Sequence, residues 1–303
     1  MKKLPKLTIK KEVQKQKLVT VIGTNYIEQI VPGLLEKSFD IYQKKDFSKK
    51  NFQVSVHENT YSTSAIVLAV LGIEAYRNRI YYLEKKKVSK SVSSDISTIF
   101  TNKDNNFPKQ DFEAILTEVF VIRDVIVHNH IYELEVVSDD NWDMISHKQK
   151  LLEGYGDDRK YKNFVNSRVR KTINLGLGVQ PGKIGFEDLF EVLIIFDLFI
   201  GIANKLLQSN YVPFRFMKKL NGQWEDSLSK YLAYFYNQIP NKKYKFSLKK
   251  HLLVVKGKFE KFLPDCCDYF LNSCCTKCKE FGFHQPNNIT KCDTCGFEIR
   301  LLP

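Results

Sequence analysis

The segment Asp111–Val137 constrains the fold of this chain most, because it is a long, strongly apolar run with helical spacing. A helix this apolar has to pack against other parts of a protein. Arginine offers a fixed cationic fork for phosphate oxygens, and histidine transfers protons near neutral pH. Within VIRDVIVHNHIYEL the segment carries Arg123, Asp124, His128 and His130. The sequence therefore predicts a buried helix with side chains suited to phosphate chemistry.

Helical geometry sets how these side chains can cooperate. Asp124 and His128 are neighbours at i, i+4, whereas Arg123 and His130 share a face at i, i+7. Arg123 and His128 point about 140° apart around the helix axis. They can act together only in a cleft that both can reach, for example one shared by two subunits.

Two further segments predict helices of the same core. Asn59–Lys87 is apolar on most sides, as a central bundle helix should be, and Phe186–Leu207 has a similar character. Glu74 lies deep in the first of these helices and is a candidate partner for Arg123. The nearby Arg77 and Arg79 either line a phosphate site or are surface charges near the helix end.

The rest of the chain is divided by its composition. Val19–Asp46 has mostly helical spacing, Val88–Lys109 is a polar connection, and Ser138–Asp158 should continue as a short helix. A helix is expected at Glu225–Asn237, and Tyr244–Phe259 alternates. The predicted divisions are a basic tail (1–18), a helical domain (19–209), a basic connector or subdomain (210–263) and a small module (264–303).

Charge is concentrated at the two ends of the chain. The net charge is +13, and Met1–Leu18 alone contains seven Lys and one Glu, whereas the central domain is nearly neutral. Basic flanks attract polyanions such as RNA, although Lys runs also serve simply as solubilising surface. Arg159–Lys171 interleaves cations with Tyr and Phe, which suits single-stranded RNA or an exposed basic hairpin. With no apolar leader or membrane span in view, a cytoplasmic protein without membrane contact is expected.

All seven cysteines lie in the last part of the chain. Two Cys-x2-Cys pairs are separated by 13 residues: Cys275 with Cys278, and Cys292 with Cys295. Two such pairs can complete a tetrahedral zinc site with no open position, so the zinc would be structural. Cys274 is an alternative to Cys275, and the further candidates are Cys266, Cys267 and His284. The spacing is similar to that of a zinc ribbon, which is expected to fold only with its metal.

The sequence RDVIVHNH resembles the Arg-x4-6-His motif of the HEPN superfamily, in which Asn, Asp or His usually follows the Arg. Ser64–Lys85 is similar to the first core helix of that family, and Ile173–Leu193 to its closing turn and helix. The resemblance covers about Thr60–Gln208. It implies a mainly α, HEPN-like helical bundle, followed here by a basic connector and a zinc ribbon. It also implies homodimerisation through the motif helix and, often, metal-independent RNA cleavage.

The resemblance also implies roles for the motif residues. His128 would transfer the proton of the ribose 2′-OH, Arg123 would stabilise the phosphate, and Asp124 would orient the imidazole. His130 fits the spacing as a second acid–base group, so either histidine is a candidate for the main role. The products would be a 2′,3′-cyclic phosphate and a 5′-OH.

Proteins of this kind resemble toxins or abortive-infection effectors, and an antitoxin or defence-system protein is a candidate partner. One branch of the family carries Arg-x4-His-x-Tyr, with the Tyr adenylylated by a nucleotidyltransferase. Here His130 occupies the Tyr position and the next Tyr is Tyr132, a departure that argues against this form of silencing. The alternative function is a non-catalytic nucleic-acid-binding or assembly protein with the same bundle and zinc ribbon.

Overall fold

The computed structural model describes residues 26–49, 53–128, 132–138, 144–151, 158–207, 211–212, 214, 216–220, 223–225, 227–263, 289–291 and 298–300. The described chain is mainly helical, as the sequence predicted. The helices are η1 (Tyr26–Ile30), α2 (Val31–Tyr42), α3 (Val56–Leu83), α4 (Val92–Lys103), α5 (Lys109–His128), α6 (Asp158–Phe164), η2 (Pro181–Lys183), α7 (Phe186–Leu206), α8 (Leu228–Gln238), α9 (Lys242–Phe259) and η3 (Glu260–Phe262).

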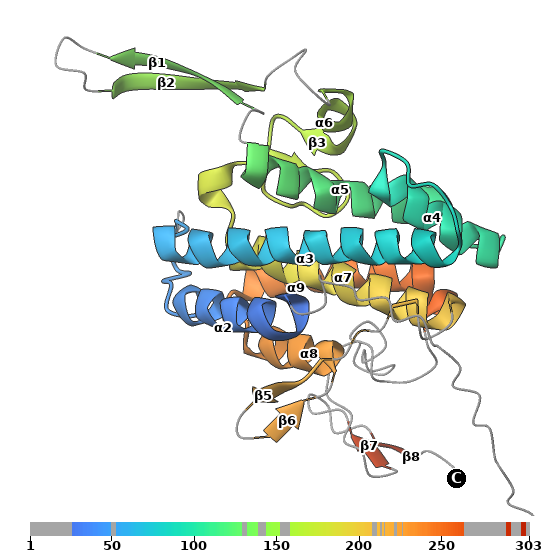
Figure 1. The fold of residues 1–303 in the computed structure, drawn as a ribbon. Helices are drawn as coiled ribbons and strands as arrows, with labels where there is room; N and C mark the ends of the chain where they lie inside the picture. Colours follow the sequence, from blue (N-terminus) through green and yellow to red (C-terminus); the bar gives the residue numbers. More distant parts are fainter. Residues whose placement is uncertain are drawn as a thin grey trace, which may run out of the picture.

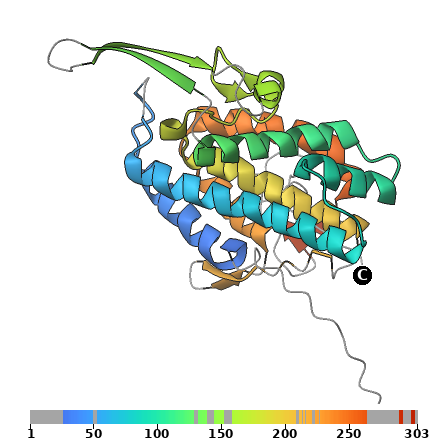
Figure 2. The same ribbon diagram turned by 45° about the horizontal axis from the view of Figure 1, so that its top comes forward.

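The described strands form four short antiparallel pairs. They are β1 (Tyr132–Ser138) with β2 (Met144–Leu151), β3 (Val165–Asn166) with β4 (Lys171–Thr172), β5 (Lys218–Leu220) with β6 (Gln223–Glu225), and β7 (Ile289–Lys291) with β8 (Glu298–Arg300). The hairpin β1–β2 extends away from the helices, whereas the long helices lie side by side (Figures 1 and 2). None of the described helices combines the length and the apolar character that a membrane crossing requires.

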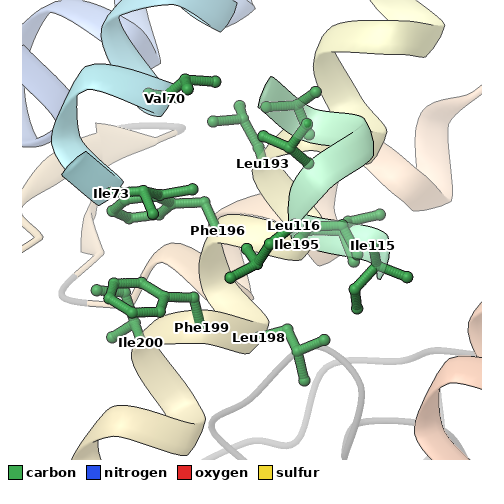
Figure 3. Packing of buried hydrophobic residues seen from close by; sticks show 14 of the residues in the cluster. Val70, Ile73, Ile115, Leu116, Leu193, Ile195, Phe196, Leu198, Phe199 and Ile200 are labelled. Atoms are coloured by element: carbon green, nitrogen blue, oxygen red, sulfur yellow. The ribbon is translucent and has the colours of Figure 1, made fainter. Parts of the chain in front are cut away.

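Two long helices, α3 and α7, form the centre of the bundle. α4 and α5 pack on one side of them, and α2 and α8 on the other (Figure 1). α7 is buried on nearly every side because its apolar residues do not follow one stripe. Figure 3 shows Ile73 of α3, Leu116 of α5 and Phe196 of α7 meeting in this core. The predicted helices at Asn59–Lys87 and Phe186–Leu207 are thus confirmed.

Local signals fix where the central helices begin. The Ser55 hydroxyl accepts a hydrogen bond from Glu58 N at 3.2 Å and caps α3. At the start of α7, Asp188 Oδ2 accepts from Gly185 N at 3.0 Å. A Cβ at Gly185 would lie 2.8 Å from Glu58 Oε1, so this glycine permits α7 to start directly beside α3.

The helical core does not end at residue 209. The segment predicted as a basic connector or subdomain, 210–263, contains α8 and α9, whose buried residues belong to the same hydrophobic cluster as those of α3 and α7. The Tyr231 hydroxyl of α8 donates to Glu36 Oε1 at 2.8 Å, and Ser229 Oγ donates to Asp197 Oδ2 at 2.6 Å. The alternation in Tyr244–Phe259 does not produce a strand, since this segment lies within α9.

Three other expectations from the sequence differ from the structure. Val88–Lys109 contains a helix, α4, whose Ile96 and Phe100 are fully buried. In the described part of Ser138–Asp158, where a short helix was expected, Met144–Leu151 forms the strand β2. The motif helix ends at His128, and the chain that follows forms β1, so the predicted helix to Val137 is too long.

Arg77 is buried, not a surface charge at the helix end. Its side chain is 6% exposed, and Nη1 lies 2.7 Å from Asp95 Oδ2. Burial alone would raise the pKa of Asp95, but hydrogen bonds from Ser89, Tyr81 and Arg77 outweigh it and hold this pKa below 3.8. The ion pair fastens α3 to α4 inside the protein.

Candidate active site at the end of α5

α5 positions the motif residues at the edge of the bundle. The helix follows Pro108 and buries Phe112, Leu116 and Val119 against the core. The burial changes along the helix, because Arg123 and Asp124 are only partly buried and Val127 and His128 are exposed. The last two turns of α5 therefore place charged side chains where a ligand can reach them.

Arg123, Asp124 and Lys160 form one charged cluster. Arg123 Nε lies 3.0 Å from Asp124 Oδ1, and Lys160 Nζ lies 2.7 Å from Asp124 Oδ2. The three side chains are 23%, 13% and 20% exposed, respectively. Two cations face one carboxylate, so the cluster keeps a net positive charge at a semi-enclosed position. Such a charge favours an anion such as a phosphate.

The guanidinium of Arg123 is further fixed by an aromatic ring. Its Cζ lies 5.6 Å from the centre of the Phe120 ring. Arg123 Nε is buried and has an ion pair, but no well-aligned hydrogen bond, with Asp124. Ring and carboxylate together restrict the guanidinium on the α5 side. In the described residues no hydrogen bond holds the terminal nitrogens, which leaves them for a ligand.

The sequence did not identify Lys160 as part of this cluster. Lys160 belongs to α6, which packs on α5, and the neighbouring Tyr161 is buried. The residue was noted only within the basic segment Arg159–Lys171. A contact across 36 residues cannot be found from helical periodicity, which relates positions only within one helix.

The structure describes two of the other predicted site residues, His128 and Glu74. His128 ends α5 and is exposed, one turn beyond Asp124. Glu74 does not partner Arg123 in the structure; its Oε1 lies 3.7 Å from Nη2 of Arg77. His130 and the four predicted zinc ligands, Cys275, Cys278, Cys292 and Cys295, lie outside the described residues, as does the basic tail 1–18.

A buried carboxylate on α5 fastens the loop that follows β4. Glu118 Oε1 accepts hydrogen bonds from Asn174 N at 2.8 Å and from Asn174 Nδ2 at 2.7 Å, and Oε2 accepts from Leu175 N at 2.7 Å. Sequence reasoning overlooked Glu118, although an acidic residue in an apolar run has to find donors. This carboxylate connects the motif helix to the Gly-rich loop before α7.

The comparisons with known proteins give no assignment. No family model matches the chain, and no curated protein or solved structure is significantly similar to it. Function therefore has to be inferred from the residues themselves. In the described part of the chain, no three His, Cys, Asp or Glu side chains form a metal-binding group.

Proposed function

We propose that this protein is a metal-independent endoribonuclease of the HEPN kind, with its catalytic cleft formed between two copies of α5. The observation that carries the proposal is the cluster of Arg123, Asp124 and Lys160, followed one turn later by the exposed His128. A fixed cation and an accessible imidazole are the two groups that RNA cleavage without a metal needs.

The proposed reaction is an internal transfer at phosphorus. His128 takes the proton of the ribose 2′-OH, and the 2′ oxygen attacks the adjacent phosphorus. The bond from phosphorus to the 5′ oxygen breaks, and this oxygen takes a proton from a second acid, for which His130 is the candidate. Arg123 stabilises the charge that grows on the phosphate oxygens, which is usually the largest contribution in such sites.

Dimerisation follows from the exposure of the same helix end. Val127 beside His128 is 50% exposed, so an apolar side chain and the imidazole lie together on the surface. Burying Val127 against a second copy would remove this apolar area from water and bring a second motif helix to the site. We propose this surface as the homodimer contact.

The decisive experiment is cleavage of total RNA by the purified protein, with mapping of the ends formed. His128→Ala and Arg123→Ala should each lower the cleavage rate about 10²–10⁴-fold, because each removes a group that acts in the transition state. His57→Ala is the matched control, since His57 is an exposed histidine on a different helix, at the start of α3. Products without 2′,3′-cyclic phosphate ends, or full activity of the His128→Ala protein, would refute the proposal.

A second candidate function is nucleic-acid binding or assembly without cleavage, and α9 favours it. α9 contains seven Lys and no Asp or Glu. Its exposed face includes Lys243, Phe246 and Lys250, and Lys250 Nζ lies 4.5 Å from the centre of the Phe246 ring. Cations next to an exposed ring suit a single-stranded nucleic acid. RNA binding by a protein that leaves the RNA intact would select this function.

We also propose a zinc ribbon after the bundle, bound through Cys275, Cys278, Cys292 and Cys295. Its described strands support the proposal, because β7 and β8 pair and the second Cys-x2-Cys lies between them in the chain. The ribbon would direct the cleavage of a cellular RNA. In that case the protein acts as a growth-arresting toxin or a phage-defence effector in the cytoplasm, held inactive by an antitoxin or a defence-system partner.

A further inference from the structure

A second site lies away from the end of α5. A cavity of about 1020 Å³, open to solvent on one side, is lined by the C-terminal end of α2, the start of α3, the loop after β4, the first turns of α7 and the N-terminal half of α9. Cavities that enclose small ligands commonly have about 300–1,000 Å³, so this space can hold a molecule of nucleotide size. Arg123, Asp124 and His128 are not among the described residues that line it.

The interior of the cavity is acidic, and most of its carboxyl oxygens are used by the fold. Asp188 accepts from Gly178 N at 2.6 Å and from Gly185 N at 3.0 Å. Glu187 Oε1 accepts from the Tyr42 hydroxyl at 2.6 Å and from Asn241 Nδ2 at 3.0 Å. These hydrogen bonds hold the start of α7 against α2, α9 and the loop.

Glu191 differs from these two residues. Its carboxyl lies within hydrogen-bond reach of the Tyr244 hydroxyl, but its Oε2 is buried and has no hydrogen-bond partner in the described part of the chain. Burial, together with the nearby charges of Asp188 and Glu187, raises the pKa of Glu191 well above 4.5. A buried acceptor without a donor is destabilising in the free protein, so a ligand that donates an N–H there gains affinity.

Two exposed lysines add positive charge to the lining of the cavity. Lys171 at β4 and Lys183 in η2 line the cavity and are exposed, so their ammonium groups can meet an anion as it enters. Aromatic rings complete the lining, with Phe186 and Tyr244 on different helices. A ligand that fits therefore has an anionic end, a planar body and an N–H donor at the other end.

We infer that this cavity binds a nucleotide, with its phosphate at Lys171 and Lys183 and an N–H group of its base donated to Glu191. A metal ion is a poorer fit, because the described carboxylates do not form a three-ligand group. A free amino acid carries both charges but fills little of the space. The inference does not depend on RNA cleavage at α5, and the nucleotide is either free or one unit of an RNA strand.

The test measures binding of AMP, GMP, CMP and UMP to the full chain by equilibrium dialysis. Saturable binding of one nucleotide per chain is expected, because each of the four bases carries an N–H donor that can reach Glu191. Glu191→Gln and Lys171→Ala should each weaken binding about tenfold, because the first replaces a carboxyl oxygen with an NH₂ donor and the second removes a cation that binds the phosphate. Lys87→Ala is the control, since this exposed lysine follows the far end of α3.

Glu191→Gln preserves the side-chain volume, and Lys171 is exposed, so both variants should fold, which circular dichroism checks. The inference is overturned if none of the four nucleotides saturates the protein, or if both variants bind as the parent does. Binding of a short RNA to the His128→Ala protein distinguishes a free nucleotide from one unit of an RNA strand. If Glu191→Gln lowers RNA affinity, the nucleotide belongs to a strand; if only binding of the mononucleotide falls, the ligand is free.

Discussion

Replacement of Glu118 tests whether this carboxylate of α5 stabilises the loop that follows β4. Glu118 is fully buried and receives three hydrogen bonds from Asn174 and Leu175. Glu118→Ala leaves the amides of both residues without an acceptor. A buried unsatisfied donor costs about 1–3 kcal/mol, so we expect the free energy of unfolding to fall by about 3–5 kcal/mol. Glu118→Gln should lose about 1–2 kcal/mol, since one acceptor oxygen remains.

Urea unfolding followed by the helical circular dichroism signal measures these losses. Glu113→Ala on the same helix is the matched control, because Glu113 is partly exposed, and its change should stay within about 0.5 kcal/mol. Hydrogen exchange gives a local measure, in which the amide of Leu175 should exchange faster in Glu118→Ala. If Glu118→Ala were as stable as Glu113→Ala, the carboxylate would not fasten the loop, and the reasoning would be wrong.

Three further predictions concern charge and metal. Burial and nearby charges raise the pKa of Glu191 above 4.5, so the unfolded chain loses this proton at a lower pH than the folded protein does. The free energy of unfolding therefore falls as the pH rises above about 4.5. Urea unfolding should show Glu191→Gln to be more stable than the parent at pH 7 and equally stable at pH 4. Cys292→Ser should release one zinc per chain in metal analysis and leave the helical signal unchanged, and full zinc content would remove the four-cysteine assignment. Asp124→Asn removes a negative charge beside Arg123, so RNA affinity in filter binding should be kept or increased. The cleavage rate should fall about tenfold, because the arginine is no longer held in place. An unchanged rate would show that Asp124 does not hold the arginine.

The central helices α3 and α7 could be predicted because long, strongly apolar segments with helical spacing have to be buried as helices. The segment that became α4 was missed because its sequence, VSSDISTIFTNK, looks like a polar connection. Its hydroxyl groups are in fact buried and bonded: Ser97 Oγ donates to Ser93 O at 2.7 Å, and Ser93 Oγ lies 2.8 Å from Thr117 Oγ1. Hydroxyl side chains that form hydrogen bonds inside the protein can be buried, so their presence in a sequence does not show that the segment is exposed.

α9 was missed for the opposite reason. Its apolar residues Leu248, Leu252, Val255 and Phe259 follow helical spacing, but the seven lysines of the helix reduce the mean hydropathy of the segment. One buried stripe is enough to attach a helix whose other faces meet water. The same lysines supply positive charge that the sequence analysis assigned to a connector or subdomain. In the structure these lysines lie on a helix.

At the candidate active site, the sequence predicted the residues of one helix and missed those that come from elsewhere. Arg123 and Asp124 are adjacent in the chain, and their ion pair follows from that. Lys160 reaches Asp124 only because α6 folds back on α5. The expected pairing of Glu74 with Arg123 failed because Arg77 lies one turn away on the same helix.

The geometry of α5 is the strongest argument that one copy of the chain is not sufficient. His128 lies five positions after Arg123, which amounts to about 140° around the axis and about 7.5 Å along it. A phosphate bound at Arg123 is therefore not in line with His128 of the same helix. In a two-fold dimer every contact occurs twice, so His128 of each copy can face Arg123 of the other. The exposed Val127 beside His128 supplies the apolar contact that such a pairing needs. On this proposal one dimer contains two equivalent clefts, and a mixed dimer of Arg123→Ala and His128→Ala chains keeps one of them intact.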